Sequence, residues 1–546
     1  MALYKDKLTD MPTQVFFHKR DNIKYVYVYT KFYRNENGKS RNISKCIGKV
    51  DSESGKLIPN DYYFIHYNVS NPIESDIYNI GYTMVVEECF KKTDLENILC
   101  KHFGYDLTTK IKVLATYISL GNISMSYVDD FMKKHYCKGI DELITSQVAS
   151  ITFESVMDCG LDSFFKEWIK KTAGRNYLCY DVTSVSTYSS NITEAEYGYN
   201  RDHEDLEQVN IGLFSVENTK IPVYYENYNG SLTDKSNVIN VVKNAKDKGL
   251  KKVKLVMDGG SFDKDRIIEL KKNGLIFTIG MPMKLKCSKE IIDSFGSNIY
   301  EYQNATGYLN TFGKLVEYEI YGVKGNVFIG MDTQARNLEI ESIKNKISRL
   351  KEELLHTRKK YDTVSKDKKF TKYFDIKPKE NSNGFAFELN SEKVNQETKY
   401  SGYFLIFTTD LEATSKDIIY YYREKDVDEK MFYAMKNYID LGRLRTHKQT
   451  TTDGKIFVSF IALIIRSWVM QKVCDYKEMN NLTYKKIANI LNDIIVILTN
   501  SDVRLLKSLT KQQKEILALF GLNTGDIDDF ISREFRWFVY YKIAGI

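Results

Sequence analysis

The sequence predicts an α/β fold whose centre is a mixed sheet flanked by helices. Three strand-like segments follow one another along the chain, at residues 176–188, 208–216 and 220–230. A helix, a strand, a second helix and a second strand come next, at about 235–248, 252–258, 263–274 and 275–281. Three consecutive strands followed by alternating helix and strand is the order of a ribonuclease H-like core.

The composition is that of a folded protein with several domains. A single hydrophobic core rarely grows beyond roughly 250 residues, so a chain of 546 residues is expected to form three or four domains. Hydrophobic residues make up 43% and charged residues 28% of the chain, and Pro and Gly are few. This composition argues against long disordered linkers.

Positive charge is concentrated locally rather than spread over the chain. The net charge of +7 is modest for this length and is weak support for a nucleic-acid partner. Residues 344–379, however, hold thirteen Lys or Arg against five Asp or Glu, and residues 251–290 hold ten against five. Such patches suit a phosphate backbone, although a solvated helix face also explains a single charge run.

Zinc ribbons, disulfide scaffolds and membrane spans are not indicated. The eight cysteines are scattered and form no CxxC pair. The N-terminal residues contain no apolar run of the kind found in a secretory signal. The longest apolar stretch, at 456–470, is interrupted by Arg466 and is shorter than the about 20 residues that span a bilayer. It predicts a buried core helix, and we expect a soluble, intracellular protein.

Changes of periodicity divide the chain into six segments. Residues 1–70 alternate apolar and polar around the turn sequence NENGKS, which predicts a β module. Residues 71–172 have helical spacing and are expected to form a helical domain that binds DNA. The pattern is compatible with a helix-turn-helix and equally with a plain helical packing domain, which is the alternative. The core occupies 173–284 and 403–475, an α+β insertion occupies 285–402, and a helical region occupies 476–546.

The insertion contains strand-like pieces and one long helix at 340–361. Ile343, Ile347, Leu350 and Leu354 form a single apolar stripe on this helix and are expected to be core. The basic residues that follow the stripe, Arg358, Lys359 and Lys360, are candidate DNA-backbone contacts. After the insertion and a last strand, Thr414 or Ser415 is expected to cap a helix, with Asp417 completing a capping box.

Three carboxylates fall at informative places on this plan. Asp181 lies in the middle of the first core strand, Asp258 lies at the end of the fourth strand, and Glu429 lies on the helix after the insertion. Ligands of open sheets bind at the carboxyl ends of strands. Such a triad can hold two divalent ions that act on a phosphodiester, and carboxylates suit Mg²⁺ or Mn²⁺. Each Asp taken singly is more often a turn residue.

The signature around Glu429 carries a resemblance to a known family. Tyr422, Lys425, Glu429 and Lys436 match the spacing of the Tyr-x2-Arg-x3-Glu-x6-Lys signature. This part of the sequence resembles the DDE transposases of bacterial insertion sequences, in the subgroup with an inserted β-rich region. Lys425 stands where that subgroup usually has Arg, and Lys lacks the bidentate geometry of Arg toward phosphate.

Four further segments add to the resemblance. The segment EYGYNRDHEDLEQVNIGL, which begins at Glu196, is similar to the subgroup's Gly-Tyr-Ser-(Lys/Arg)-Asp-His block, and GSLTD at 230–234 is similar to its Gly-Asn-x-x-Asp. DGGSF at 258–262 has one residue more than the usual Asp-x-Gly-Phe. The segment that begins LGRLRTHK at Leu441 is similar to the Arg-Pro segment, with Thr446 in place of Pro.

The resemblance implies a site and a cofactor. It implies that Asp181, Asp258 and Glu429 are catalytic residues that bind two Mg²⁺ (or Mn²⁺) ions. It also implies that Tyr422, Lys425 and Lys436 hold phosphates of the transposon end, and that Arg201 borders the active site. Without the resemblance, the two lysines are explained by ion pairs on a solvated helix face, and Arg201 is explained as a turn residue.

The function that follows is that of a DNA transposase. It would nick the transposon ends and join the freed 3′-hydroxyls to target DNA, with a ribonuclease H-like catalytic core. The expected partners are double-stranded DNA, carrying terminal inverted repeats or target sequence, and a second copy of the chain in a homodimer. We expect a cytoplasmic, nucleoid-associated bacterial protein without a membrane partner. The alternatives are a nuclease of the same fold that does not join strands and a transposase-derived DNA-binding protein that no longer cleaves.

Overall fold

The computed structural model divides the chain into two compact units. One unit comprises residues 1–88, 126–144 and 472–546, and the other comprises residues 89–125 and 145–471. The structure describes residues 3, 5, 7–34, 39–67, 76–122, 124–140, 142–158, 160–173, 178–198, 204–216, 219–232, 234–250, 254–257, 259–308, 310–379, 384–420, 422, 443–498 and 503–544.

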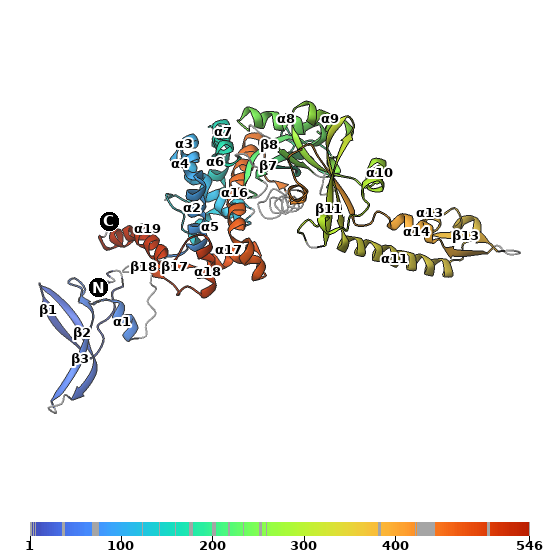
Figure 1. Ribbon diagram of the computed structural model, residues 1–546. Helices are drawn as coiled ribbons and strands as arrows, with labels where there is room; N and C mark the ends of the chain where they lie inside the picture. Colours follow the sequence, from blue (N-terminus) through green and yellow to red (C-terminus); the bar gives the residue numbers. More distant parts are fainter. Residues whose placement is uncertain are drawn as a thin grey trace. The chain divides into compact units, whose positions relative to one another are not determined.

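The larger unit is built on a nine-stranded mixed sheet (Figure 1). Its first three strands, β6 (Leu178–Thr187), β7 (Gln208–Val216) and β8 (Pro222–Asn229), pair antiparallel in chain order. β9 (Lys254–Met257) and β10 (Ile276–Met281) then continue the sheet on the other side of β6, and both are parallel to it in direction. The strand order predicted from the sequence is therefore confirmed.

Two helices connect these parallel strands and cover the sheet. α8 (Asp234–Asp247) leads to β9, and α9 (Lys264–Lys272) leads to β10. α8 buries Val238, Val241, Val242 and Ala245, which are spaced to form one apolar stripe. The mixed sheet with flanking helices agrees with the predicted fold class.

The sheet extends into the segment that was predicted as an insertion. β15 (Tyr403–Thr408) pairs antiparallel with β10, β12 (Val323–Asp332) pairs with β15, and β11 (Thr311–Ile320) pairs with β12. The sequence interpretation assigned the strand-like pieces now seen as β11 and β12 to the α+β insertion at 285–402. They join the core sheet because β12 is buried along most of its length and its backbone needs partners on both sides.

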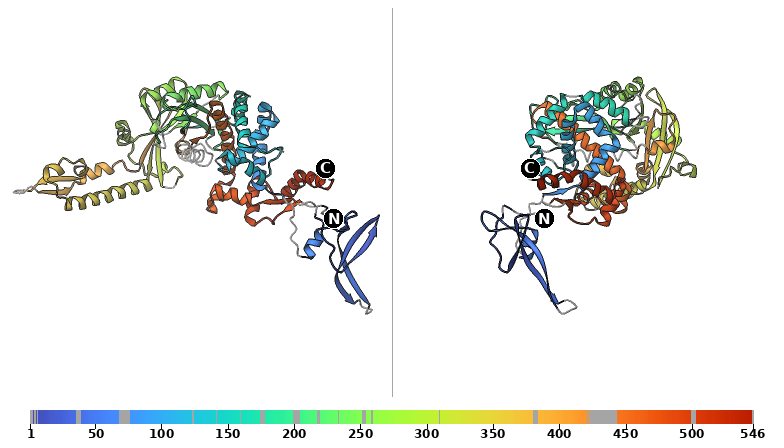
Figure 2. Two further views of the ribbon diagram at one scale, coloured as in Figure 1. Left: turned by 180° about the vertical axis from the view of Figure 1, so that it is seen from behind. Right: turned by 90° about the vertical axis from the view of Figure 1, so that its left-hand side faces the viewer.

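Residues 361–379 and 384–398 of the insertion form a small cluster at the far end of one helix (Figure 2). α10 (Lys286–Phe295) precedes β11, and α11 (Thr333–His356) follows β12. The remaining elements are α12 (Tyr361–Val364), α13 (Lys368–Thr371), β13 (Phe374–Pro378), β14 (Phe385–Leu389) and α14 (Ser391–Thr398). The predicted stripe is core: Ile347, Leu350 and Leu354 are buried, and Ile343 packs against the same cluster.

Helices complete the larger unit. They are α3 (Leu95–Phe103), α4 (Tyr105–Ser119), α6 (Ser146–Met157), α7 (Leu161–Thr172) and most of α16 (Gln449–Met479). Phe165 of α7 lies with its ring centroid 5.5 Å from those of both Tyr225 of β8 and Phe460 of α16. Among the described residues α16 is the one helix long and apolar enough to cross a membrane, but 83% of that apolar window is buried inside the protein. The predicted core helix is confirmed.

The smaller unit contains two further sheets. β1 (Val15–Arg20), β2 (Ile23–Arg34), β3 (Ser40–Val50) and β4 (Leu57–Pro59) pair in chain order, and α1 (Asp61–His66) follows them. The second sheet has the order β18 (Val503–Leu505), β17 (Ile495–Leu498), β5 (Asp76–Asn79). The helices of this unit are α5 (Val128–Lys134), α17 (Tyr484–Asn492), α18 (Lys511–Leu519), α19 (Thr524–Ala544) and part of α2 (Gly81–Thr93).

Three predictions from the sequence can be compared with this unit. The region after 476 was expected to be helical, but β17 and β18 lie within it; strands of four and three residues are too short to show a period. The helices of the predicted 71–172 segment are divided between the two units. The strands expected on either side of the NENGKS turn form the antiparallel pair β2 and β3.

Candidate active site

β9 and β10 end at one edge of the core sheet, beside the first half of β6, which continues past them. Cys179 of β6 pairs in parallel with Val256 of β9, and Met257 of β9 pairs in parallel with Ile279 of β10. Asp181 follows Cys179 by two residues, within β6, and pairs on its other side with Leu213 of β7. Ligands bind at the carboxyl ends of strands in open sheets, so this edge is the candidate site.

Five of the ten predicted site residues lie outside the described part of the chain. Those residues are Arg201, Asp258, Lys425, Glu429 and Lys436. Asp181 is described by its place in the strand, and Tyr422, Arg358, Lys359 and Lys360 are described in full.

Tyr422 lies against the end of β10. A Cβ atom added to Gly280 would come under 3.0 Å from the Tyr422 hydroxyl oxygen, closer than real Cβ atoms approach other atoms. A Cβ added to Gly259, in the turn after β9, would meet the carbonyl oxygen of Gly280 at 3.4 Å. Residue 422 of the signature therefore lies at the strand edge that the parallel register defines.

The helix that carries Tyr422 begins with the predicted capping box. The Thr414 amide and hydroxyl donate to Asp417 Oδ2 at 2.9 and 2.6 Å, and the Asp417 amide donates back to Thr414 Oγ1 at 3.3 Å. Residues 415–420 are helical, and Ile418 and Ile419 are fully buried. Together with partly buried Tyr422 they belong to one apolar cluster that also contains Phe328 and Ile406 of the sheet.

The turn after β9 is short and closed. Gly259–Ser261 form a single 3₁₀ turn, and the Phe262 amide donates to the carbonyl oxygen of Gly259 at 3.1 Å. Asp263 then caps α9 by accepting from the amides of Asp265 and Arg266. The additional residue of the DGGSF segment is accommodated in this turn, directly before α9.

Two of the sequence segments that carry the resemblance touch through their glycines. A Cβ on Gly198 would lie under 3.0 Å from the carbonyl oxygen of Gly230, and a Cβ on Gly230 would lie under 3.0 Å from that of Gln208. Gln208 Nε2 donates to the Gly230 carbonyl oxygen at 3.1 Å, and Ser231 donates to the Glu196 carboxylate. The segments that begin at Glu196 and Gly230 are therefore joined backbone to backbone.

Arg443 ties the segment after the signature to the end of β6. β16 (Arg443–Leu444) pairs in parallel with Ser186 and Thr187. The guanidinium of Arg443 donates to the Glu204 carboxylate at 2.7 Å and to the Tyr188 hydroxyl, and it lies 4.8 Å from the Tyr188 ring centroid. Glu204 directly follows Arg201, Asp202 and His203 in the chain, and those three residues lie outside the described part of the structure.

A group of partly buried carboxyls lies beside these segments. Gln449 Nε2 and Asn227 Nδ2 donate to Asp453 Oδ1 at 2.9 and 3.2 Å, and the Glu194 amide donates to Gln449 Oε1 at 3.4 Å. Burial of the Glu194 carboxyl, with the nearby carboxylates of Asp453 and Glu226, raises its pKa to about 7. Burial also raises the pKa of Asp453. The Glu194 carboxyl is therefore partly protonated near neutral pH.

The described residues do not assemble a metal site by themselves. Among them, no group of three or more His, Cys, Asp or Glu is placed to hold a metal ion. Two of the three predicted ligands, Asp258 and Glu429, lie outside this set.

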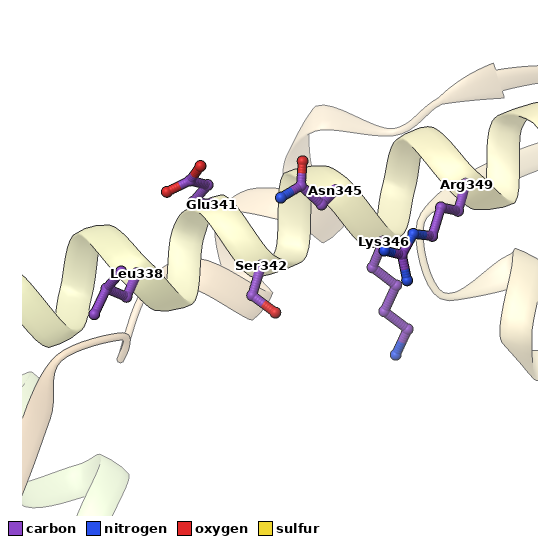
Figure 3. Close-up of a pocket in the computed structure, with 6 residues that line it drawn as sticks. All are labelled: Leu338, Glu341, Ser342, Asn345, Lys346 and Arg349. Atoms are coloured by element: carbon purple, nitrogen blue, oxygen red, sulfur yellow. The ribbon is translucent and has the colours of Figure 1, made fainter.

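Two hollows lined by described residues lie on the insertion. One, of about 460 Å³, is lined by residues of α11 alone: Leu338, Glu341, Ser342, Asn345, Lys346 and Arg349 (Figure 3). An opening formed by one helix face does not enclose a substrate. The other, of about 500 Å³, lies where α11 ends beside β14, and its lining includes Arg358, Lys359, Lys360, Phe385 and Phe387.

Comparison with known families decides the assignment. The family profile described as "Transposase DDE domain" matches residues 172–465, more than half of the chain and the whole of the core sheet. This protein is a member of the DDE transposase family. The prediction that it resembles a DDE transposase is thereby confirmed, and membership implies a ribonuclease H-like fold and action on DNA.

Other comparisons add little to the family assignment. No curated protein matches the chain. One solved structure with similarity to this DDE transposase is a piggyBac transposase synaptic complex with hairpin DNA, at 12% identity over 82% of each chain. Its TM-score is 0.34, which is too low to support an inference about fold or function.

Sequence reasoning missed three residues that shape this transposase site: Gly280, Glu204 and Arg443. A glycine inside a strand is a signal for close approach of another group, and Gly280 in TIGM fits that rule. The Arg443–Glu204 pair joins residues far apart in the chain, and no local pattern predicts it.

Proposed function

We propose that this protein is an active transposase that nicks the ends of a transposon and joins their 3′-hydroxyls to target DNA. The observation that carries the proposal is the β6–β9 register within the family match. Cys179 pairs with Val256, and Asp181 and Asp258 each follow this pair by two residues in their own segments. Asp181 lies in β6, and Asp258 directly follows β9 in the sequence. Two acidic residues that close to a parallel strand pair would suit a shared metal site.

The proposed catalytic residues are Asp181, Asp258 and Glu429. Their carboxylate oxygens are the donor type that Mg²⁺ and Mn²⁺ prefer, and we propose that they hold two such ions. The ions would polarise the phosphodiester and stabilise the charge on the attacking and leaving oxygens. In this proposal the three carboxylates hold the ions, and the scissile phosphate would be positioned through those ions and not by the carboxylates directly.

Residues around the triad are proposed to hold the transposon end. Tyr422, Lys425, Lys436 and Arg201 would contact its phosphates, with the hydroxyl and cationic groups as donors. The position of Tyr422 against Gly280, at the carboxyl end of β10, supports its part of this proposal.

The insertion is proposed to extend the DNA contact. Arg358, Lys359 and Lys360 are exposed and line the same hollow as Phe385 and Phe387. Three adjacent exposed cations are suited to bind a phosphate backbone. Duplex DNA carrying terminal repeats or target sequence would be the substrate, and a homodimer would bring two ends together. The proposed location is the bacterial cytoplasm, in association with the nucleoid.

Cleavage of labelled DNA tests the proposal. A duplex carrying the DNA that flanks the gene is incubated with Mg²⁺ or Mn²⁺ and with the wild-type chain, Asp258→Asn or Glu429→Gln. The expected result is metal-dependent nicking at the element boundary that both substitutions abolish while DNA binding persists. Binding without cleavage would favour the non-catalytic DNA-binding alternative, and cleavage without joining to target DNA would favour a nuclease.

A further inference from the structure

The outer half of the β2–β3 hairpin is a ribbon of two strands (Figure 1). β1 pairs with β2 only between Ile23 and Val28. Beyond Tyr29, β2 pairs with β3 alone among the described strands, as far as Arg34 opposite Ser40. We call residues 29–34 and 40–45 the distal ribbon. A two-stranded ribbon is at best marginally stable by itself, so a partner that covers it would stabilise it.

Large side chains of the distal ribbon are open to solvent. Tyr29, Phe32, Tyr33 and Ile43 are 41%, 67%, 45% and 43% exposed. The ring of Tyr29 stacks on Phe16 of β1 at 4.4 Å, and the ring of Phe32 lies 5.3 Å from Tyr29. A row of aromatic rings therefore extends from the packed part of the sheet onto the ribbon. Contiguous exposed apolar surface of this kind marks an interaction site.

The distal ribbon is also strongly basic. Lys31, Arg34, Arg41 and Lys45 are all exposed, and the ribbon strands contain no Asp or Glu. Within the described part of the chain, no ion pair joins these four cations to a carboxylate. Residues 15–50 hold nine Lys or Arg against two acidic residues, an excess equal to the net charge of +7 of the whole chain. This charge is complementary to a polyanion.

The cations lie on both faces of the ribbon. Lys31 is opposite Ile43 and Tyr33 is opposite Arg41, so Lys31, Tyr33 and Arg41 share one face. Phe32 is opposite Asn42 and Arg34 is opposite Ser40, which places Arg34 on the other face. A partner that contacts one face alone would leave the cations of the other face without an anionic group.

A bulge gives the ribbon additional twist. The register shifts between Tyr29 and Lys31, which leaves Thr30 as an extra residue, and Thr30 Oγ1 donates to the carbonyl oxygen of Ile43 at 3.2 Å. Bulges increase the right-handed twist of a strand pair. The ribbon is therefore a twisted element rather than a flat stacking surface.

We propose that the distal ribbon inserts into the major groove of duplex DNA. The major groove is about 12 Å wide and admits a two-stranded ribbon. Its two phosphate walls would meet the two ribbon faces, with Lys31 and Arg41 toward one wall and Arg34 toward the other. A second copy of the chain would bring like charges together, which disfavours dimerisation through this surface. The inference goes beyond the proposed function, which assigns no role to residues 1–70.

A binding measurement in EDTA tests the inference without any contribution from cleavage. The full-length wild-type chain, Lys31→Ala/Arg41→Ala and Phe32→Ala are titrated against a fluorescein-labelled duplex of general sequence at several salt concentrations. The matched control is Lys511→Ala/Lys514→Ala, which removes two exposed lysines from α18 of the same unit. Thermal unfolding of every variant checks that the fold is retained.

The inference predicts at least about tenfold weaker binding for Lys31→Ala/Arg41→Ala, because two phosphate contacts are lost. The slope of log K against log salt should fall by about 1.8, and the control should bind as the wild type does. Methylation of guanine N7 in the major groove should interfere with binding of the wild-type chain. Equal affinities of the ribbon variant and the control would overturn the inference, as would stronger competition by single-stranded DNA than by duplex. A change in oligomeric state of the ribbon variants with unchanged DNA affinity would assign the ribbon to self-association and also overturn it.

Discussion

The hydroxyl oxygen of Tyr422 lies against the Cα atom of Gly280, so residue 280 has no room for a side chain. This contact joins the first turns of the signature helix to the end of β10. It places the first residue of the signature beside the strand edge where the proposed catalytic residues belong. The position of the signature helix therefore depends on a glycine in a buried strand.

Substitution of this glycine should displace Tyr422. We expect Gly280→Ala to lower the free energy of unfolding by about 1–3 kcal/mol, because the new methyl group overlaps a packed ring. Urea denaturation of the full chain measures the change. Gly259→Ala is the matched control, since its Cβ would meet its nearest neighbour at 3.4 Å, an ordinary contact. Equal denaturation midpoints for the two variants would contradict the described packing.

The contact between Gly198 and Gly230 should be still less tolerant. A Cβ on Gly198 meets a backbone carbonyl that cannot rotate away, so we expect Gly198→Ala to cost about 2–4 kcal/mol of stability. Ser231→Ala removes only the hydrogen bond to Glu196 and should cost about 1 kcal/mol or less. Thermal unfolding of both variants distinguishes the two effects. A Gly198→Ala chain that unfolds at the wild-type temperature would show that the two segments are not joined as described.

Glu194 should make stability depend on pH in the neutral range. Its pKa is raised from 4.5 to about 7, so the folded state favours the protonated acid. The stability that protonated Glu194 contributes is fully present below about pH 4.5 and is lost as the pH rises through about 7. Between pH 5 and 8, the free energy of unfolding should therefore fall by about 1 kcal/mol less in Glu194→Gln than in wild type, after allowance for solvent screening of a partly exposed group.

Denaturation of wild type and Glu194→Gln at a series of pH values between 5 and 8 measures the effect. Glu196→Gln is the control, because hydrogen bonds from Ser231 and Asn229 lower the pKa of Glu196. That variant should differ from wild type by a constant amount over this range. Parallel pH profiles for wild type and Glu194→Gln would refute the assignment of the raised pKa.

The basic residues at the end of α11 should contribute to DNA affinity in a salt-dependent way. Replacement of Arg358, Lys359 and Lys360 by Ala should reduce the slope of log K against log salt by about 2–3, because each phosphate contact contributes about 0.9. Replacement of exposed Lys507, Lys511 and Lys514 removes the same charge elsewhere and serves as the control. An unchanged slope in the first variant would show that these three residues of the insertion do not contact DNA.

Local sequence patterns predicted the order of the core strands well, because each strand is a compact apolar run bounded by turn residues. The capping box at Thr414 and the stripe on α11 were predicted for the same reason, since both depend on residues three or four apart. Membership of β11 and β12 in the core sheet was not predicted. Pairs such as Asn326 with Thr408 join distant segments, and no local signal encodes them.

In the candidate site, too, features that depend on neighbouring residues were predictable, and contacts between distant segments were not. Asp181 could be placed on a strand from its neighbours alone, and the structure puts it in β6. The approach of Tyr422 to Gly280 and the pair of Arg443 with Glu204 depend on how distant segments fold together. Asp258 and Glu429 lie outside the described residues, so their roles stay predictions.

The central claim is that Asp181 binds the metal ion that supports phosphodiester cleavage. Asp181→Cys tests it most directly, because a thiolate binds Mn²⁺ better than the harder Mg²⁺. The measurement is the rate of nicking of a duplex carrying the flanking DNA, with wild type and variant in each metal. We predict that wild type cleaves with both ions, whereas Asp181→Cys cleaves measurably with Mn²⁺ and not with Mg²⁺. Cleavage by Asp181→Cys at the wild-type rate in Mg²⁺ would contradict the claim.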